Sequence, residues 1–249
     1  MKGDADFDDL GDAFEADVYG TSKGRVRLEV LWEDLLEAVP EIADGKLSVL
    51  DAGGGSGRLA VRLARAGNRV LLCDPSERML SMARERVEEE GVADRITLVQ
   101  SDVAGLADAV SERFDLVCCH AVLEWLADPR AAIGPLAERR EPEGRLSLMF
   151  YNRNAAVLKR VLRGDFDCDV PAGEGPTPLD PEEVAGWLEA AGLRVLSKAG
   201  VRIFHDHMPP DVVEAGIERL LEVEKAYRRR EPFASLGQHV HLVCGRSRP

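Results

Sequence analysis

The chain has 249 residues, 45% of them hydrophobic, and a formal net charge of −13 at pH 7, which allows one large domain with its own core. The acidic balance argues against a generic nucleic-acid binder, which would usually be basic. No apolar stretch approaches the roughly 18 residues of a membrane span, and the acidic start Asp4-Ala5-Asp6 is unlike a signal peptide. We therefore expect a cytoplasmic protein with no membrane segment.

The chain divides into four segments of one predicted domain, residues 1–249. A helical segment extends to about residue 39, and a core with alternating strands and helices follows over 40–151. An insertion covers 152–181, and 182–249 completes the sheet. The five cysteines show no C-x-x-C spacing, so we expect buried reduced thiols and no metal site.

The first strand of the core leads into a glycine-rich turn, Val49-Leu50-Asp51-Ala52-Gly53-Gly54-Gly55-Ser56-Gly57. Glycine accepts positive φ and lets a ligand approach the backbone closely. Leu59, Leu63 and Ala66 then recur at helical spacing, and a helix N-terminus suits a negatively charged group. The turn therefore predicts a nucleotide-like ligand; the alternative is a surface turn that binds nothing.

Three ligand classes use such a turn, and the residue after Gly57 separates them. A phosphate-binding loop of nucleotide hydrolases would continue with Lys and then Ser or Thr, but here Arg58 and Leu59 follow. The dinucleotide fingerprint requires glycine or alanine where Arg58 stands. What remains resembles motif I of the class I methyltransferases, which bind S-adenosylmethionine. The resemblance assigns Asp51, Gly53, Gly54 and Gly55 to cofactor binding.

The following strands end at further candidate cofactor residues. Arg69 to Cys73 is followed by Asp74, whose carboxylate can accept hydrogen bonds from both ribose hydroxyls. After the third strand, Ile96 to Val99, Asp102 and Val103 lie against the adenine by resemblance to the superfamily. The fourth strand, Phe114 to Cys119, ends at His120, to which the resemblance gives a cofactor contact; a structural histidine is the alternative.

The remaining elements complete the predicted sheet. A fifth strand, Arg145 to Phe150, follows the turn Glu141 to Gly144. The last elements are a helix, a bent strand region, a second helix and a final strand, at Pro181 to Ala191, Leu193 to Phe204, Asp211 to Tyr227 and His239 to Cys244. The predicted class is α/β: a Rossmann-like, seven-stranded, mostly parallel sheet with helices on both faces.

Several blocks outside the glycine-rich turn make the resemblance narrower. They resemble the bacterial tRNA 5-carboxymethoxyuridine methyltransferases, which methylate the carboxylate of a modified wobble uridine. The blocks lie, in order, at Tyr19 to Arg27, Asp51 to Gly55, His120 to Trp125, Leu146 to Asn152, Gly200 to Asp206, and Glu231 to Phe233 with Leu236-Gly237. The resemblance implies S-adenosylmethionine as cofactor and the anticodon stem-loop of tRNA as partner.

One segment departs from this family. Its members carry a lysine-rich run in the insertion, whereas here residues 170–178 contain no lysine. If that run holds RNA phosphates, this protein must use arginines elsewhere or bind RNA more weakly; a plain solvated arginine is the ordinary interpretation of each candidate. The candidates are Arg153, Arg160, Arg163 and Arg228 to Arg230.

The implied reaction needs no general base and no metal, because an ionised carboxylate is already a nucleophile at neutral pH. By resemblance, Arg27 binds the methionine carboxylate of the cofactor; an exposed helix arginine is the alternative. Tyr151, Arg202 and His205 are the candidates for positioning the substrate, with Tyr19 and Lys23 in a lid. His207, His241 and the three tryptophans are expected to be structural.

Two other functions remain open from the sequence. The acidic surface and the missing lysine run would also suit a small-molecule carboxyl methyltransferase. A module that binds S-adenosylmethionine without turnover is the third hypothesis, which the presence of Arg202 and Tyr151 disfavours.

Overall fold

A computed structural model describes residue 8 and residues 20–167 and 175–246. Tyr19 and Cys168, which the sequence analysis singled out, lie outside the described residues, as does most of the lysine-free segment. The other four cysteines, Cys73, Cys118, Cys119 and Cys244, are buried free thiols, as expected.

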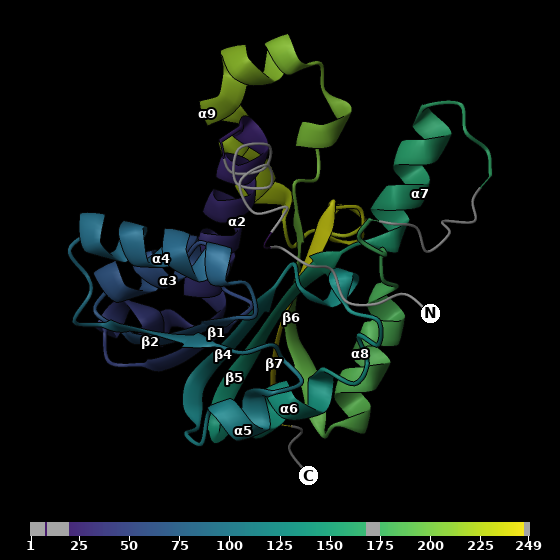
Figure 1. Cartoon of the computed structure of the whole chain (residues 1–249). Helices are drawn as coiled ribbons and strands as arrows, with labels where there is room; N and C mark the ends of the chain where they lie inside the picture. Colours follow the sequence, from purple (N-terminus) through teal and green to yellow (C-terminus); the bar gives the residue numbers. More distant parts are fainter. Residues whose placement is uncertain (1–7, 9–19, 168–174, 247–249) are drawn as a thin grey trace.

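One seven-stranded sheet organises the fold, in the order β3-β2-β1-β4-β5-β7-β6 (Figure 1). Only β7 runs antiparallel to its neighbours, β5 and β6, so the predicted mostly parallel sheet is confirmed. The strands are β1 (Ser48–Ala52), β2 (Arg69–Asp74), β3 (Ile96–Gln100), β4 (Phe114–His120), β5 (Arg140–Tyr151), β6 (Leu193–Val201) and β7 (His239–Arg246).

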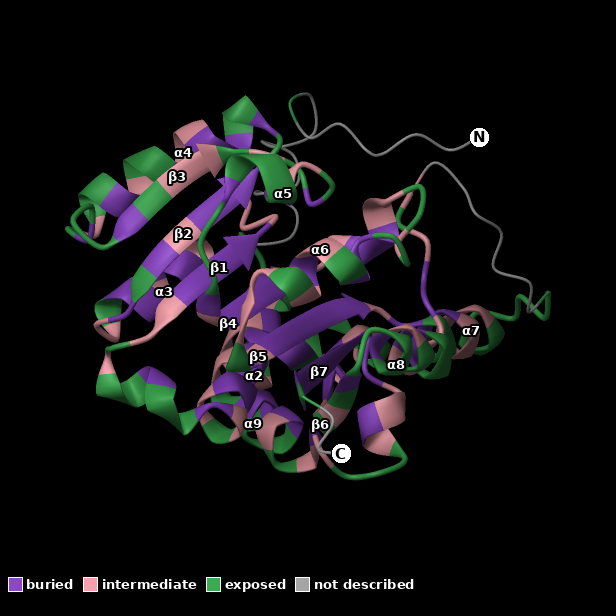
Figure 2. Ribbon diagram, turned by 90° about the horizontal axis from the view of Figure 1, so that it is seen from below, coloured by how far each residue is buried: buried purple, intermediate pink, exposed green. Residues whose placement is uncertain are grey.

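Helices cover both faces of the sheet and bury its apolar side chains (Figure 2). On one face, α2, α3 and α4 close a core that contains Leu35, Leu63 and Leu80; on the other, α5, α6 and α8 close a core with Leu136 and Leu188. The helices are α2 (Ser22–Ala38), α3 (Arg58–Arg65), α4 (Glu77–Glu89), α5 (Leu106–Ala109), α6 (Ile133–Glu138), α7 (Arg153–Leu162), α8 (Pro181–Ala190) and α9 (Pro210–Tyr227). Within the described ranges, 3-10 helices lie at η2 (Pro40–Asp44), η3 (Leu123–Trp125), η4 (His205–His207) and η5 (Phe233–Ser235).

Local sequence explains where several helices begin. The Ser76 hydroxyl accepts a hydrogen bond from the Met79 N–H at 3.1 Å, which caps α4 as predicted. Asp180 caps α8 through the Glu182 N–H at 2.8 Å, and Pro181 takes the first helical position. These caps fix the ends of the helices on opposite faces of the sheet.

The structure corrects three details of the predicted elements. The predicted turn Glu141 to Gly144 lies within β5, because Arg140 already pairs with Phe114 and a register shift absorbs the extra residues. The predicted insertion begins with a helix, α7. The strand region expected to reach Phe204 ends at Val201, and Arg202 adopts a left-handed φ of 60° that a strand cannot continue.

Candidate active site

The glycine-rich turn joins β1 to α3 at the carboxyl end of the sheet. Gly55 has a φ of 54°, and a Cβ placed on it would meet no atom within 4 Å. Open space therefore lies beside this backbone, as a closely bound ligand requires. At Gly54, by contrast, a Cβ would lie 2.6 Å from Leu72 Cγ, so packing alone demands glycine there.

Two acidic side chains stand beside the turn. Asp74, at the end of β2, accepts hydrogen bonds from the Gly55 N–H at 2.9 Å and from the Ser76 N–H at 3.0 Å. Asp51 is 2% exposed, and its Oδ2 has no hydrogen-bond partner among the described residues. Burial, together with the charge of Asp74, raises the pKa of Asp51 to about 7. Both carboxyls retain the capacity to accept hydrogen bonds from a ligand.

A small cavity opens between this turn and α2. Arg27, Asp51, Gly53, Gly54 and His120 are among the residues that line it. Arg27 comes from α2 and His120 from the end of β4, so the fold brings together predicted cofactor residues from distant parts of the sequence. The buried Nδ1 of His120 has no partner in the described part of the chain. Open space at Gly55 and unsatisfied polar atoms on Asp51 and His120 fit a polar cofactor.

Asp102 and Val103 lie after β3 and do not line this cavity. Asp102 is exposed and accepts a hydrogen bond from the Gly105 N–H at 2.6 Å, whereas Val103 is 4% exposed within the core. Their assignment to the adenine stays a prediction.

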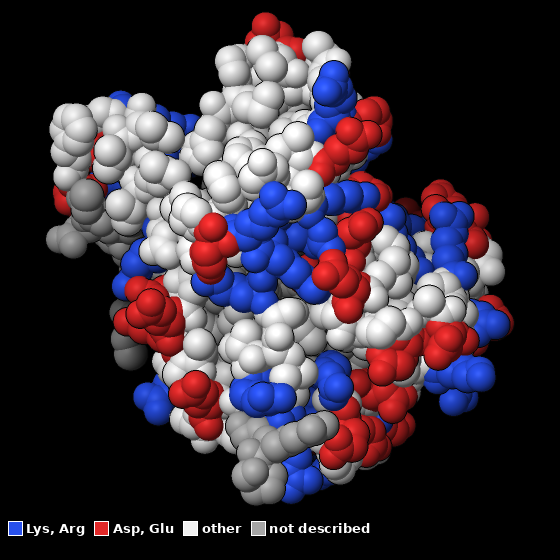
Figure 3. Space-filling view, turned by 180° about the vertical axis from the view of Figure 1, so that it is seen from behind, with Lys and Arg blue, Asp and Glu red and all other residues white. Residues whose placement is uncertain are grey.

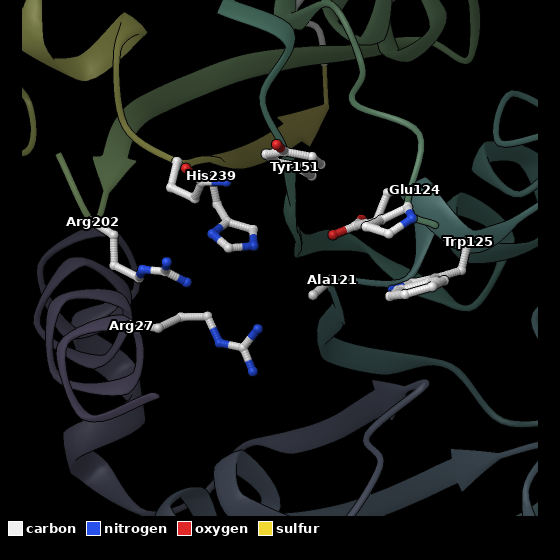
Figure 4. Close-up of a pocket in the computed structure, with 9 residues that line it drawn as sticks. Arg27, Ala121, Glu124, Trp125, Tyr151, Arg202 and His239 are labelled. Atoms are coloured by element: carbon white, nitrogen blue, oxygen red, sulfur yellow. The ribbon is translucent and has the colours of Figure 1, made fainter. Parts of the chain in front are cut away.

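A second, larger cavity of about 230 Å³ adjoins the first (Figure 4). Arg27 lines both cavities, and Tyr151 and Arg202, which are predicted substrate residues, line the larger one. Figure 4 shows the guanidinium groups of Arg27 and Arg202 pointing into the space from one side, opposite Glu124. The remaining lining residues are Ala121, Trp125, Pro176, Gln238 and His239.

Glu124 was not among the predicted site residues. Its side chain is buried, and Oε2 has no hydrogen-bond partner within the described ranges. Burial raises its pKa to about 7, although the backbone N–H groups of Glu124 and Tyr151 and the charge of Arg27 partly oppose this. The cavity therefore has a buried carboxyl group on one side and two guanidinium groups on the other.

The substrate side holds two more residues that the sequence analysis missed, Gln238 and His239, and it changes the interpretation of Trp125. Trp125 belongs to η3 and lines the cavity, so the expectation of a purely structural helix tryptophan was wrong for it. Glu124 could have been noticed as the one acidic residue in an otherwise apolar block; Gln238 and His239 carry no comparable signal. They reach the cavity because β7 pairs with β5, where His239 lies opposite Tyr151.

Lys23 and His205 occupy the neighbourhood of the larger cavity without lining it. Lys23 is exposed on the first turn of α2. His205 is 6% exposed: its Nδ1 contacts Asp206 Oδ1 at 2.9 Å, and its Nε2 contacts Ser22 Oγ at 2.9 Å. In this arrangement His205 fixes the start of α2 against the Arg202 segment.

Comparisons with known proteins agree with this geometry. A methyltransferase-domain family matches residues 25–198. The tRNA 5-carboxymethoxyuridine methyltransferase of Escherichia coli (strain K12) is 39% identical over 254 aligned residues, covering 97% of this chain and 96% of the relative. The ubiquinone biosynthesis O-methyltransferase of Hahella chejuensis is 32% identical over 164 residues, covering 61% of this chain and 65% of the relative.

Among solved structures, the magnesium protoporphyrin IX methyltransferase of Synechocystis PCC 6803 with bound SAH aligns with a TM-score of 0.66 at 20% identity, covering 97% of this chain and 96% of that one. The sheet order and the glycine-rich turn at its carboxyl edge define a class I, S-adenosylmethionine-dependent methyltransferase. Within that class, the chain belongs to the family of the E. coli tRNA 5-carboxymethoxyuridine methyltransferase.

Within residues 20–167 and 175–246, none of the helices combines the length and the apolar character that crossing a bilayer requires.

Proposed function

We propose that this enzyme transfers the methyl group of S-adenosylmethionine to the carboxylate of 5-carboxymethoxyuridine at the wobble position of tRNA, in the cytoplasm. One observation carries the proposal: Arg27 and Arg202, both buried, converge on a cavity that adjoins the cofactor cavity. A planar guanidinium is suited to bind a carboxylate through two hydrogen bonds.

The cofactor supplies an electrophilic methyl group on a sulfonium. An ionised carboxylate has a reference pKa near 4, so no residue of the chain has to remove a proton from it at neutral pH. The task of the enzyme is positioning, which can contribute up to about 7–11 kcal/mol in favourable cases. Arg27 and Arg202 would hold the carboxylate groups in place, and the site needs no general base.

The cofactor-side residues suit different chemical groups of S-adenosylmethionine. Asp74 stands at the end of β2, where a carboxylate can accept hydrogen bonds from ribose hydroxyls. The place of Arg27 in the lining of the cofactor cavity supports its contact with the methionine carboxylate, and Gly55 leaves open space beside the backbone. Asp51, Gly53 and Gly54 complete the turn.

On the substrate side, Tyr151 and His239 form one wall, with ring centroids 6.2 Å apart. Burial lowers the pKa of His239 well below its ordinary value, as do the charges of Arg27 and Arg202. A neutral imidazole and a phenol offer hydrogen bonds and an apolar surface to a uracil ring without adding charge. Glu124 faces them and is suited to accept a hydrogen bond from a ring N–H group.

The RNA backbone would contact the rim near α7, which begins two residues after Tyr151. Burial lowers the pKa of Lys159, and so do the nearby charges of Arg163, Arg202 and Lys23. Four cations therefore lie near one another in a protein whose net charge is −13, and one of them, Arg202, lines the larger cavity. Arg153, at the start of α7, is also exposed.

Other arginines considered for RNA contact are engaged within the protein. Arg228 Nε lies 3.2 Å and Arg229 Nε 2.6 Å from Asp34 Oδ1, and both also pair with Glu37. Arg160 pairs with Asp165 at 2.9 Å. On the face shown in Figure 3, basic side chains gather near the centre with acidic ones on both sides, so no uniformly basic surface is present there.

Nucleoside mass spectrometry tests the proposal directly. Purified enzyme and S-adenosylmethionine should convert 5-carboxymethoxyuridine to its methyl ester in tRNA from a strain lacking the activity. No ester in the presence of bound cofactor would leave the non-catalytic module as the better hypothesis. Equal turnover of intact tRNA and free modified nucleoside would instead favour the small-molecule carboxyl methyltransferase.

A further inference from the structure

Four polar side chains, three of them fully buried, form a continuous hydrogen-bonded chain from α2 to the cofactor cavity. Asp34 Oδ2 lies 2.7 Å from His241 Nδ1, and His241 Nε2 lies 2.7 Å from Ser147 Oγ. Ser147 Oγ in turn lies 2.8 Å from His120 Nε2. Asp34, Ser147 and His241 are each fully buried, as suits the structural role expected of His241.

The hydrogen bonds of this side-chain network all run in one donor-to-acceptor direction, and the carboxylate of Asp34 sets that direction. Burial raises the pKa of Asp34, but the hydrogen bond of His241 and the charge of Arg229 bring it down to about 2. An ionised carboxylate only accepts hydrogen bonds, so His241 must carry its proton on Nδ1. Asp34 is already matched by the guanidiniums of Arg228 and Arg229, so a second proton on His241 would be an additional buried charge.

The remaining steps follow from counting protons. Neutral His241 has a bare Nε2, which must accept the single hydroxyl proton of Ser147. The Ser147 oxygen then accepts a hydrogen bond from His120, whose proton must therefore lie on Nε2. Burial and the charge of Arg27 lower the pKa of His120 well below its ordinary value, so its other nitrogen, Nδ1, carries no proton.

We propose that the chain Asp34–His241–Ser147 holds His120 in its Nε2–H tautomer and so presents a bare Nδ1 to the cofactor cavity as acceptor for a primary ammonium group. This inference rests on the proposed cofactor. Nδ1 is buried and has no partner within the described segments, so a ligand donor would satisfy it. Arg27 lines the same cavity and offers donors. Together, Arg27 and His120 match the carboxylate and the ammonium of an α-amino acid end.

The inference makes Asp34, Ser147 and His241 positioning residues, because none of them lines the cavity. Their effect on the cofactor passes through one proton position on His120. A single isosteric substitution can therefore reverse the chain. In Asp34→Asn the side-chain amide can donate to His241 Nδ1, which moves the His241 proton to Nε2, turns the Ser147 hydroxyl toward His120, and moves the His120 proton to Nδ1.

Nitrogen NMR of ¹⁵N-histidine-labelled, ligand-free protein measures this proton position. Wild-type His120, assigned by comparison with His120→Gln, should show a pyridine-type Nδ1 and a pyrrole-type Nε2, and Asp34→Asn should exchange the two. Glu37→Gln is the matched control, because Glu37 contacts Arg228 and Arg229 but is not part of the chain. It should leave His120 unchanged. A protonated Nδ1 in the wild type would overturn the proposal.

Calorimetric titration supplies the ligand side of the test. Asp34→Asn should bind S-adenosylmethionine about tenfold or more weakly, whereas Glu37→Gln should bind it as the wild type does. For an analogue that lacks the α-amino group, wild type and Asp34→Asn should bind alike; an equal loss with the analogue would contradict the ammonium assignment. If Asp34→Asn does not fold, Ser147→Ala breaks the chain instead and should mix the His120 tautomers.

These readouts do not depend on the tRNA substrate. Enzyme that shows the predicted tautomer and cofactor affinities but forms no methyl ester on tRNA would refute the proposed function and leave this inference intact. A reversed His120 tautomer in an enzyme that methylates tRNA would overturn this inference and leave the proposed function intact.

Discussion

Arg202 and Asp206 form a buried ion pair at the wall of the larger cavity. Arg202 Nε lies 3.1 Å from Asp206 Oδ1, and Nη2 contacts both carboxylate oxygens. The two side chains are 9% and 4% exposed. Because Arg202 lies in left-handed backbone just past β6, the pair holds its guanidinium toward the cavity rather than along the strand.

Arg202→Ala should therefore lower methyl transfer by about 100-fold or more while cofactor affinity stays near the wild-type value, since losing one partner of a desolvated charge pair costs about 2–5 kcal/mol. The same change leaves Asp206 buried without Arg202 and should also reduce stability by about 3–5 kcal/mol. Steady-state kinetics, cofactor titration and urea unfolding measure the three quantities.

The double variant Arg202→Ala, Asp206→Asn separates these effects. Neutralising Asp206 should restore most of the stability, but the activity should remain low. Activity that recovers together with stability would mean that Arg202 acts only through folding.

Asp74→Asn should weaken S-adenosylmethionine binding about tenfold with little change in kcat at saturating cofactor. The loss of one charged hydrogen-bond acceptor accounts for about 1.5–3 kcal/mol, part of which the amide oxygen retains. Ser76→Ala is the control, because it removes the cap of α4 at a cost of about 1 kcal/mol in stability but leaves the Asp74 carboxylate in place. Equal weakening in both variants would reduce Asp74 to a structural role.

Glu124→Gln should change the pH dependence of stability. Folding raises the pKa of Glu124 from 4.5 to about 7, so between these values the folded state holds a proton that the unfolded chain has lost. The contribution of Glu124 to stability is therefore greatest below pH 4.5 and falls as pH rises to about 7. The free energy of unfolding of the variant should therefore rise relative to that of the wild type across this window. The difference between the two proteins should change by roughly 3 kcal/mol between pH 4.5 and pH 8.

Urea unfolding at pH 5, 6, 7 and 8 gives the comparison. Glu85→Gln, an exposed position on α4, should leave the wild-type profile unchanged. A constant difference between Glu124→Gln and wild type at all four pH values would contradict a buried, titrating carboxyl.

The basic rim near α7 gives a prediction about RNA. The double variant Arg153→Gln, Arg163→Gln should bind tRNA more weakly and reduce the slope of log affinity against log salt by about 1.4, or about 0.7 for each lost contact with single-stranded phosphate. Methylation of the free nucleoside should not change. Both residues are exposed and lie at the two ends of α7.

The control is Arg84→Gln, Arg113→Gln, which removes the same charge from exposed positions on α4 and next to β4. Electromobility or fluorescence titrations at several salt concentrations measure the slopes. An identical change in both double variants would indicate a nonspecific effect of net charge and count against a specific rim.

The parts of the fold that follow from local pattern were predicted well. The alternation of strands and helices, the cap at Ser76 and the turn after Asp51 depend on residues close together in the chain. The turn Glu141 to Gly144 was predicted wrongly because its residues favour a turn locally, while pairing between Arg140 and Phe114 holds them in the sheet. Pairing with a distant strand outweighed the local preference.

The sequence by itself determined the glycine-rich turn and the acidic strand ends beside it, because such a turn and the end of its own strand keep their spacing wherever the strand lies. Only the tertiary structure decided what surrounds the substrate. Glu124, Gln238 and His239 meet Arg27 there because β4, β7 and α2 converge on one edge of the sheet. Likewise, Asp34 and His241 are 207 residues apart and are joined by one hydrogen bond. Such contacts arise from packing between elements, and no local pattern of residues records them.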